Sequence, residues 1–399
     1  MIGRPRALLG WEFGAGLEHV RRLVVIARAL SADGWTPVLA LRDLAYASEA
    51  QKAGFSILQA PVPPSMTSGL PKFKTASYGE IIASFGFGHP DVTAAILSAW
   101  DALIDLVNPQ VVVADYSPFL SLAAFGHKPV IGIGDGFVLP PGHLHEFPAL
   151  TSGGTRPLDY EKTRADINAI QKRRARPFVA SLPSIIGGAG QIVCTYPELD
   201  VYGAHRTVPA QGPLGLRSPR LARAPRQKLF FYLASDYGMT WRMVEAIAAL
   251  DVEAHGFVRS APQELKDKCA RPGLHFYDSP PPIVDALRES TAIVHHGGVG
   301  TSEAVLAAGR PQLLVPRHLE QRLNTRAQMR LGAALAVLSP FTPEAAKAAL
   351  EGLLSRSELY VAADALSEKL ALRDCGQSLA MIVEACESAA QQSRSGNSV

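Results

Sequence analysis

The amino-acid sequence predicts an α/β protein built from two doubly wound, Rossmann-like domains. Its 399 residues exceed what one ordinary hydrophobic core holds. Short apolar runs alternate with helical patterns in both halves, which is typical of parallel sheets covered by helices on both faces. A polar stretch at 206–228, interrupted by prolines and rich in arginine, separates the halves and has the composition of a linker.

In the first half, apolar runs of strand length recur between segments of helical periodicity. Gly34 ends the first helix, and Asn108-Pro109 ends the second. The expected strands are 7–10, 37–41, 53–58, 111–114, 129–133 and 191–195, and the expected helices are 20–30, 91–106, 118–125 and 160–176.

The second half repeats this alternation and adds helices at its end. The expected strands are 229–233, 253–258, 274–277, 292–294, 312–315 and 335–338, and the expected helices are 241–250, 283–287, 301–308, 327–331, 343–354, 359–372 and 377–390. We therefore predict an N-terminal domain at 1–205, a C-terminal domain at 229–375, a helix at 376–390 that packs back on the N-terminal domain, and a disordered tail at 391–399.

Composition excludes several classes of protein. The net charge of +3 is too small to indicate nucleic-acid binding. The four cysteines are scattered without metal-ligand spacing, which favours reduced thiols and predicts no metal site. No apolar run approaches the roughly 20 residues of a membrane span, and no signal peptide is recognisable. We expect a cytoplasmic enzyme.

The first glycine turn follows strand 7–10, where open α/β sheets place their ligands. Its spacing, Gly14-x-Gly16-x-x-His19, puts a histidine where a dinucleotide-binding loop has its third glycine, which counts against NAD binding. His19 is a candidate general base, although a capping or packing role is an open alternative. Asp115, at the end of strand 111–114, could orient His19 or could cap the following helix.

The second glycine turn, 295–300, follows strand 292–294 and precedes helix 301–308. Thr301 or Ser302 is expected to cap this helix, and Gly309 to end it. Glycines allow close backbone approach, and a helix N-terminus offers unpaired N–H groups, so the turn favours phosphate binding. A purely structural turn is the alternative.

Two further regions could contact an acceptor. Residues 61–90 are rich in proline, glycine and aromatic residues, and a long loop of this kind is often functional, although it could equally be a surface excursion. The basic run at 161–176 is more often a solvated face, but it could touch an anionic acceptor or a membrane surface.

A family resemblance becomes specific in the second half. It rests on His296-Gly297-Gly298-x-Gly300-Thr301, then Gly309-Arg310-Pro311, Pro316 and Glu320-Gln321-x-x-Asn324. This order resembles the donor-binding signature of UDP-sugar glycosyltransferases that act on small molecules such as macrolides and flavonoids. The resemblance implies the GT-B fold, in which two doubly wound domains face each other across a cleft.

The resemblance also implies roles for individual residues. His296, the backbone of Gly297, Gly298 and Gly300, and the Thr301 hydroxyl would bind the diphosphate. Glu303 would bind the ribose, Glu320 and Gln321 the sugar, and Ser279 stands in the loop expected near the nucleobase. His19 would be the base and Asp115 its partner. Glu320 replaces the commoner aspartate, and Glu18 precedes His19 where glycine is usual.

The implied activity is that of an inverting, metal-independent glycosyltransferase, with a UDP- or dTDP-sugar as co-substrate and no other cofactor. The acceptor would be a hydroxyl group of a small or lipid-like molecule, and peripheral membrane contact is left open. Two alternatives share the fold: a nucleotide-sugar epimerase, which needs no acceptor, and a catalytically silent partner subunit.

Overall fold

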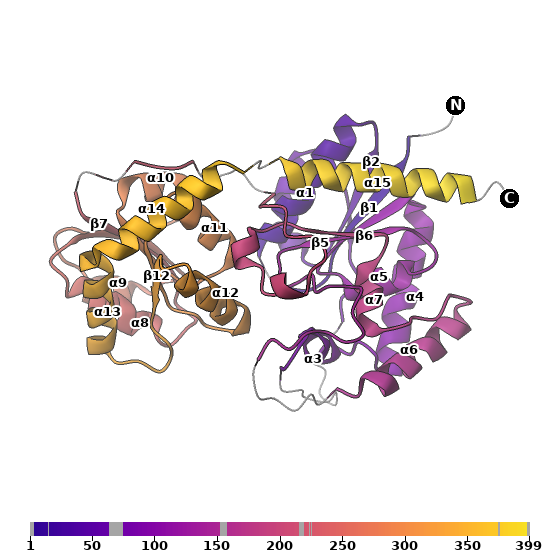
Figure 1. Ribbon diagram of the computed structural model, residues 1–399, viewed down its shortest axis with the longest axis horizontal. Helices are drawn as coiled ribbons and strands as arrows, with labels where there is room; N and C mark the ends of the chain where they lie inside the picture. Colours follow the sequence, from indigo (N-terminus) through magenta and orange to yellow (C-terminus); the bar gives the residue numbers. More distant parts are fainter. Residues whose placement is uncertain are drawn as a thin grey trace. The chain divides into compact units, whose positions relative to one another are not determined.

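A computed structural model describes the chain except for residues 1–3, 15, 64–74, 152–157, 215–218, 223, 225, 374–375 and 397–399. The chain forms two compact units, each with its own sheet (Figure 1). Unit 1 consists of Met1–Gly215 and Cys375–Val399, and unit 2 is Leu216–Asp374.

Unit 1 contains a six-stranded parallel sheet in the order β3-β2-β1-β4-β5-β6. The order reverses between β1 and β4, and open α/β sheets bind ligands at the carboxyl ends of the strands at such a switch point. The strands are β1 (Arg6–Trp11), β2 (Thr36–Leu41), β3 (Ser56–Gln59), β4 (Val111–Asp115), β5 (Val130–Gly134) and β6 (Gly190–Val193).

The helices of unit 1 cover both faces of this sheet, which explains why β4 and β5 are buried throughout and read as unbroken apolar runs. They are α1 (Leu17–Ala32), α2 (Ser48–Lys52), α3 (Tyr78–Ala83), α4 (Pro90–Val107), α5 (Pro118–Ala124), α6 (Tyr160–Arg173), α7 (Leu182–Gly187) and α15 (Gln377–Gly396), with short 3-10 turns η1 (Leu44–Tyr46), η2 (Pro197–Leu199) and η3 (Gly203–His205).

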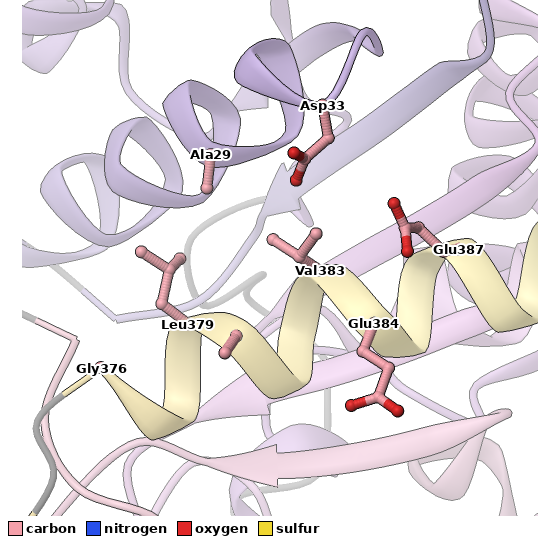
Figure 2. A pocket seen from close by; sticks show the side chains of 8 residues that line it. Ala29, Asp33, Gly376, Leu379, Val383, Glu384 and Glu387 are labelled. Carbon is pink, nitrogen blue, oxygen red and sulfur yellow. The ribbon is translucent and has the colours of Figure 1, made fainter.

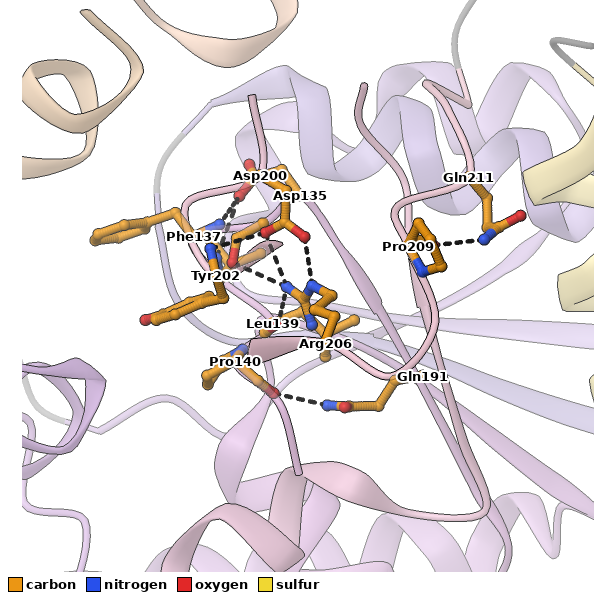
Figure 3. Close-up of polar contacts among 12 residues, drawn as sticks. Asp135, Phe137, Leu139, Pro140, Gln191, Asp200, Tyr202, Arg206, Pro209 and Gln211 are labelled. Atoms are coloured by element: carbon orange, nitrogen blue, oxygen red, sulfur yellow. Dashed lines mark hydrogen bonds and ion pairs between the residues drawn. The ribbon is translucent and has the colours of Figure 1, made fainter. Parts of the chain in front are cut away.

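Buried polar contacts fix the loop that follows β5 at the carboxyl edge of the sheet (Figure 3). Asp135 Oδ1 accepts hydrogen bonds from the backbone N–H groups of Phe137 and Val138, at 2.9 and 3.2 Å. Arg206 forms a buried ion pair with Asp200 and donates 2.8 Å to the carbonyl of Leu139 in this loop. A buried guanidinium needs such partners, so Arg206 ties the loop to the segment that leaves the sheet.

Unit 2 contains a second six-stranded parallel sheet, in the order β12-β11-β10-β7-β8-β9. This order is the same as that of unit 1, with the switch point between β7 and β10. The strands are β7 (Lys228–Ala234), β8 (Glu253–Arg259), β9 (Leu274–Phe276), β10 (Ala292–His295), β11 (Gln312–Leu314) and β12 (Ala334–Ala336).

The helices of unit 2 are α8 (Thr240–Ala248), α9 (Gln263–Lys268), α10 (Ile283–Glu289), α11 (Val299–Ala307), α12 (Leu319–Arg330), α13 (Pro343–Ser355) and α14 (Ser357–Ala371). Arg310, from the family signature, is buried after α11 and donates to the carbonyls of Leu221 and Ala222, at 3.2 and 2.7 Å. Leu221 and Ala222 of the expected linker therefore belong to unit 2. By contrast, Arg206, the first residue of that linker, has its side chain buried in unit 1.

The C-terminal helix α15 belongs to unit 1, where it packs along α1 and contributes Ile382 and Cys386 to the core. It continues to Gly396 rather than giving way to a disordered tail at 391, since alanine and glutamine at its end are good helix formers. Residues 397–399 of the expected tail lie outside the described part of the chain.

A groove of about 520 Å³ lies between the end of α1 and α15. Figure 2 shows Leu379 and Val383 of α15 pointing toward Ala29 of α1 and toward Asp33, which follows α1. At 1.5 Å per residue, the groove lies roughly 20 Å along α1 from the first turn of that helix, so it is remote from the carboxyl edge of the sheet, where α1 begins.

Candidate active site

The first turn of α1 presents His19 at the carboxyl edge of the unit 1 sheet. Gly16, the N-cap of α1, has a φ of 117°, so glycine is needed where the chain turns from β1 into the helix. The buried face of α1, which includes Val20, Leu23 and Val24, packs on the core and fixes the helix in position.

His19 contacts Asp115 at the switch point of the sheet. His19 Nδ1 lies 3.1 Å from Asp115 Oδ2, and Arg22 Nη1, one helical turn further on, donates 2.7 Å to the other carboxylate oxygen. The Asp115 side chain is fully buried, while those of His19 and Arg22 are each 12% exposed. The structure thus brings together the two residues predicted as base and partner, and adds Arg22, which sequence reasoning missed.

The charges around Asp115 keep its carboxyl group ionised. Burial acts to raise the pKa of Asp115, but the Arg22 guanidinium and His19 outweigh it, so the pKa lies below its ordinary value. An ionised Asp115 accepts the Nδ1–H of His19, which leaves the lone pair of the imidazole on Nε2. In this state His19 can accept a proton.

The ring of His19 fits between Trp11 and the glycine turn. It stacks on Trp11 with ring centroids 5.1 Å apart and an interplanar angle of 13°. Gly14 has a φ of 80°, and a methyl group added there would lie 2.7 Å from His19 Nε2. Only glycine gives both this backbone conformation and this space for the ring.

Glu12 is a buried ionisable residue that sequence reasoning also missed. Its carboxylate accepts hydrogen bonds from the N–H groups of Phe119 and Leu120, both at 2.9 Å, at the N-terminus of α5, and from the indole of Trp100. Burial raises the pKa of Glu12 to about 8, and these donors oppose the shift. Glu12 therefore anchors the turn after β1 to α5. It lies close to the site, but its side chain bonds to α5 and Trp100 rather than to His19.

Aromatic side chains surround this edge. Tyr116, with an unusual positive φ of 48°, has its ring 6.4 Å from that of His19, 5.5 Å from that of Phe13 and 5.9 Å from that of Tyr78. Phe85 contacts Phe13 at 4.8 Å, so part of the 61–90 region does lie against the site. Residues 64–74 of that region, Phe73 included, lie outside the described residues.

In unit 2, the glycine turn is held by two histidines with opposite tautomers. Ala234 N–H, at the end of β7, donates 2.9 Å to His296 Nε2, so Nδ1 carries the proton and donates 2.8 Å to the Val315 carbonyl. Gly297 N–H donates 3.1 Å to His295 Nδ1, so His295 Nε2 donates 2.7 Å to Gln312. Burial lowers the pKa of each histidine to about 4.

These bonds change the expectation for His296. Both of its ring nitrogens have backbone partners, so the ring cannot donate to a diphosphate unless one of these bonds breaks. Sequence could not show this because Ala234 and Val315 are far from His296 along the chain. His296 instead joins the carboxyl ends of β7, β10 and β11 at the switch point of unit 2.

Helix α11 begins at Val299, two residues earlier than expected, and its N-cap is Gly298 rather than Thr301 or Ser302. Gly297 has a φ of 81°, and a methyl group on it would lie 3.1 Å from Thr325 Oγ1, whereas a methyl group on Gly298 would meet nothing within 4 Å. The first backbone N–H groups of α11, which include those of Val299 and Gly300, lack intrahelical acceptors, a feature that anion-binding helix N-termini share.

The remaining predicted donor residues are also in unit 2 but differ in setting. Glu303 and Glu320 are half-buried on α11 and α12, and Ser279 is exposed in the loop between β9 and α10. Gln321 Oε1 accepts 2.9 Å from Arg317 N–H. Asn324, which completes the signature, donates 3.2 Å to the Gly297 carbonyl and so supports the glycine turn.

A charged cluster beside His296 was also missed. Arg317 pairs with both carboxylate oxygens of Asp236, at 3.1 and 3.2 Å, and Arg259 approaches the same carboxylate at 3.3 Å. Asp236 precedes Tyr237, whose ring lies 5.8 Å from that of His296, and both arginines act with burial to lower the pKa of His296. By contrast, the basic helix α6 is partly neutralised, because Lys162 pairs with Asp166 and Arg174 with Asp101.

The strand orders and glycine turns define the GT-B class of fold, and comparisons with solved structures agree. The glycosyltransferase VinC in complex with DTDP superimposes with a TM-score of 0.68 at 18% identity, covering 96% of this chain and 100% of that one. The spinosyn rhamnosyltransferase SpnG with spinosyn aglycone gives 0.62 at 19% identity, covering 94% and 99%.

Sequence comparisons find similar proteins as well. Residues 245–386 match the family described as erythromycin biosynthesis protein CIII-like, C-terminal domain. L-demethylnoviosyl transferase from Streptomyces niveus is 28% identical over 346 residues, which cover 81% of this chain and 83% of the relative. The chain thus has the GT-B fold, and the relatives and solved structures that it resembles are named glycosyltransferases or transferases. None of the helices in its described part is long and apolar enough to cross a membrane.

Proposed function

We propose that the protein is an inverting, metal-independent glycosyltransferase. It would transfer a sugar from a UDP- or dTDP-sugar to a hydroxyl group of a small molecule, with His19 as the general base and Asp115 as its partner. The observation that carries this proposal is the 3.1 Å contact between His19 Nδ1 and buried Asp115, which leaves Nε2 to accept a proton.

In the proposed reaction, the acceptor hydroxyl gives its proton to His19 Nε2 while its oxygen forms a bond to the anomeric carbon. The bond between that carbon and the diphosphate breaks on the opposite face, so the configuration inverts. The negative charge that develops on the diphosphate would be stabilised by the N-terminus of α11, at Gly298 and Val299.

The donor assignment in unit 2 is part of the same proposal. The backbone at Gly297, Gly298 and Gly300 and the Thr301 hydroxyl would hold the diphosphate, and His296 would position the turn rather than contact it. Glu303 would bind the ribose, while Glu320 and Gln321 would bind the sugar. The names of two solved relatives, which include DTDP and an aglycone, support a dTDP-linked donor and a small-molecule acceptor.

The test combines UDP-, dTDP- and GDP-linked hexoses with a panel of phenolic and alcoholic acceptors. We expect transfer from a uridine or thymidine donor, an inverted anomeric configuration by NMR, and unchanged turnover in EDTA. Interconversion of the donor sugar without an acceptor would instead indicate an epimerase. Donor binding without transfer to any acceptor would indicate a silent subunit, and loss of activity in EDTA would contradict metal independence.

A further inference from the structure

Arg22 and His19 contact the two oxygens of a single buried carboxylate, that of Asp115. Asp115 Oδ1 receives Arg22 Nη1 at 2.7 Å, and Asp115 Oδ2 contacts His19 Nδ1 at 3.1 Å. Both side chains reach the carboxylate from α1, since the two residues stand three positions apart on one helical face. A base–carboxylate pair needs only one of these partners, so the guanidinium calls for an explanation.

We propose that Arg22 is a positioning residue for the base: by holding one oxygen of Asp115 it directs the other to His19 Nδ1 and so orients the ring with Nε2 beside Gly14. This inference rests on the proposed role of His19. It adds a residue that the family signature in the sequence does not contain.

The physical reason is the charge of the buried carboxylate. Without a second cation, the negative charge of Asp115 would favour the protonated form of the neighbouring imidazole. The Asp115–His19 pair would then take up this proton at a higher pH than it does beside Arg22. A protonated His19 cannot act as a base. The Arg22 charge satisfies one oxygen of Asp115 and opposes a second positive charge on the His19 ring beside the same carboxylate.

The other ionisable groups near His19 do not balance the negative charge of Asp115 as Arg22 does. Glu18 is exposed and pairs with Arg21, and the carboxylate of Glu12 is bonded to Trp100 and the N-terminus of α5. The groups that face the site from neighbouring elements are Tyr116 after β4, Tyr78 on α3, Tyr46 on η1, and Arg42 at the end of β2, which donates to the Glu12 carbonyl.

The experiment measures kcat/KM against pH for the wild type, Arg22→Met, Arg22→Gln and Arg22→Lys. In the two neutral variants we expect the acidic limb to move up by about one pH unit, so that activity on this limb falls about tenfold while activity near pH 9 stays within about twofold of the wild type. Arg22→Lys, which keeps the charge, should restore most of the wild-type profile.

Arg21→Gln is the matched control, because Arg21 precedes Arg22 on the same helix but is exposed and pairs with Glu18 and Glu49. Its profile should superimpose on that of the wild type. If kcat/KM fell by the same factor at every pH in both neutral variants, the role of Arg22 would be purely structural and the proposal would be overturned. An Arg22→Lys variant as impaired as Arg22→Met would overturn it as well.

A second readout separates this inference from the proposed function. The titration of the His19 ring is followed by NMR, with His19→Ala used to assign the signal, and its midpoint should rise in Arg22→Met. An unchanged midpoint would refute the role of Arg22 even in an active enzyme. Full activity of His19→Ala would instead refute the base, whatever the titration showed.

Discussion

The two units have the same strand order but use their switch points differently. In unit 1, the edge carries ionisable side chains, with Asp115 between His19 and Arg22. In unit 2, the same edge presents backbone groups. Two neutral, buried histidines hold the glycine turn, and the N-terminus of α11 follows it. Under the proposed function, one topology would support proton transfer in one place and anion binding in another, because the turns after β1 and β10 carry different residues.

The largest expected effect comes from removing the proposed base in unit 1. His19→Ala should lower kcat by about 10²- to 10⁴-fold, because proton transfer to a positioned base contributes a factor of that size. Donor affinity, measured by calorimetry with dTDP or UDP, should not change. His89→Ala, an exposed histidine before α4, is the control. If both variants turned over alike, unit 1 would not supply the base.

The next effect tests whether Gly14 makes room for that base. Gly14→Ala should lower kcat by about 10²-fold, because a methyl group 2.7 Å from His19 Nε2 displaces the ring, and should cost about 1 kcal/mol of stability. Gly34→Ala introduces the same backbone strain at a φ of 83° but meets nothing within 4 Å.

Chemical denaturation and steady-state kinetics distinguish the two glycines. Both alanine variants should lose similar stability, while only Gly14→Ala loses activity. Equal loss of activity in Gly34→Ala would mean that backbone strain, and not the position of the imidazole, controls the reaction.

A pair of glycines tests the backbone site of unit 2. Gly297→Ala should lower stability by about 1–2 kcal/mol, because its φ of 81° is unfavourable for alanine and the methyl group presses on Thr325. Gly298→Ala has an ordinary φ of −62° and open space, so the fold should be unaffected.

The prediction for binding is different from the prediction for folding. If the diphosphate occupies the space at the N-terminus of α11, the Gly298→Ala methyl group should weaken nucleotide binding about tenfold with an unchanged melting temperature. Calorimetry and thermal unfolding measure the two quantities. Wild-type affinity in Gly298→Ala would place the phosphate elsewhere.

The last prediction concerns pH and the stability of unit 2. The pKa of His295 and of His296 is about 4 in the folded protein, against an ordinary value of 6.5, so the unfolded chain binds protons first as the pH falls. Stability contributed by each neutral ring, on the order of 2–3 kcal/mol, is therefore present above about pH 6.5 and lost as the pH falls toward 4.

Hydrogen exchange of β10 and α11, corrected for intrinsic rates, should show weaker protection at pH 5 than at pH 7. In unit 1, Glu12 should act with the opposite sign, because its raised pKa means that its contribution falls as the pH rises from 4.5 toward 8. Protection of α11 that is independent of pH would contradict the burial of neutral histidines.

Much of the fold could be predicted because its signals are local. Buried parallel strands such as β4 and β10 read as apolar runs, and glycine ends α1 and α11 wherever a positive φ is needed. Short elements without strong periodicity, such as α2, α7 and α9, were missed because single turns carry little pattern.

The start of α11 was misplaced for a related reason. A threonine or serine is the usual side-chain cap, whereas the chain uses the N-cap position of Gly298 without any side-chain cap. Likewise the end of α15 was placed too early, because a small, polar C-terminal segment resembles a tail in composition although it continues a helix.

By itself, the sequence determined the α/β class, the alternation of strands and helices, and the positions of His19, Asp115 and the glycine turn. These follow from hydrophobic periodicity and from residue types that act within a few positions of one another. Only the tertiary structure decided which charges meet. It paired Arg22 with Asp115, engaged both nitrogens of His296 and buried Glu12 against α5, because these contacts join strands and helices that are remote in the chain.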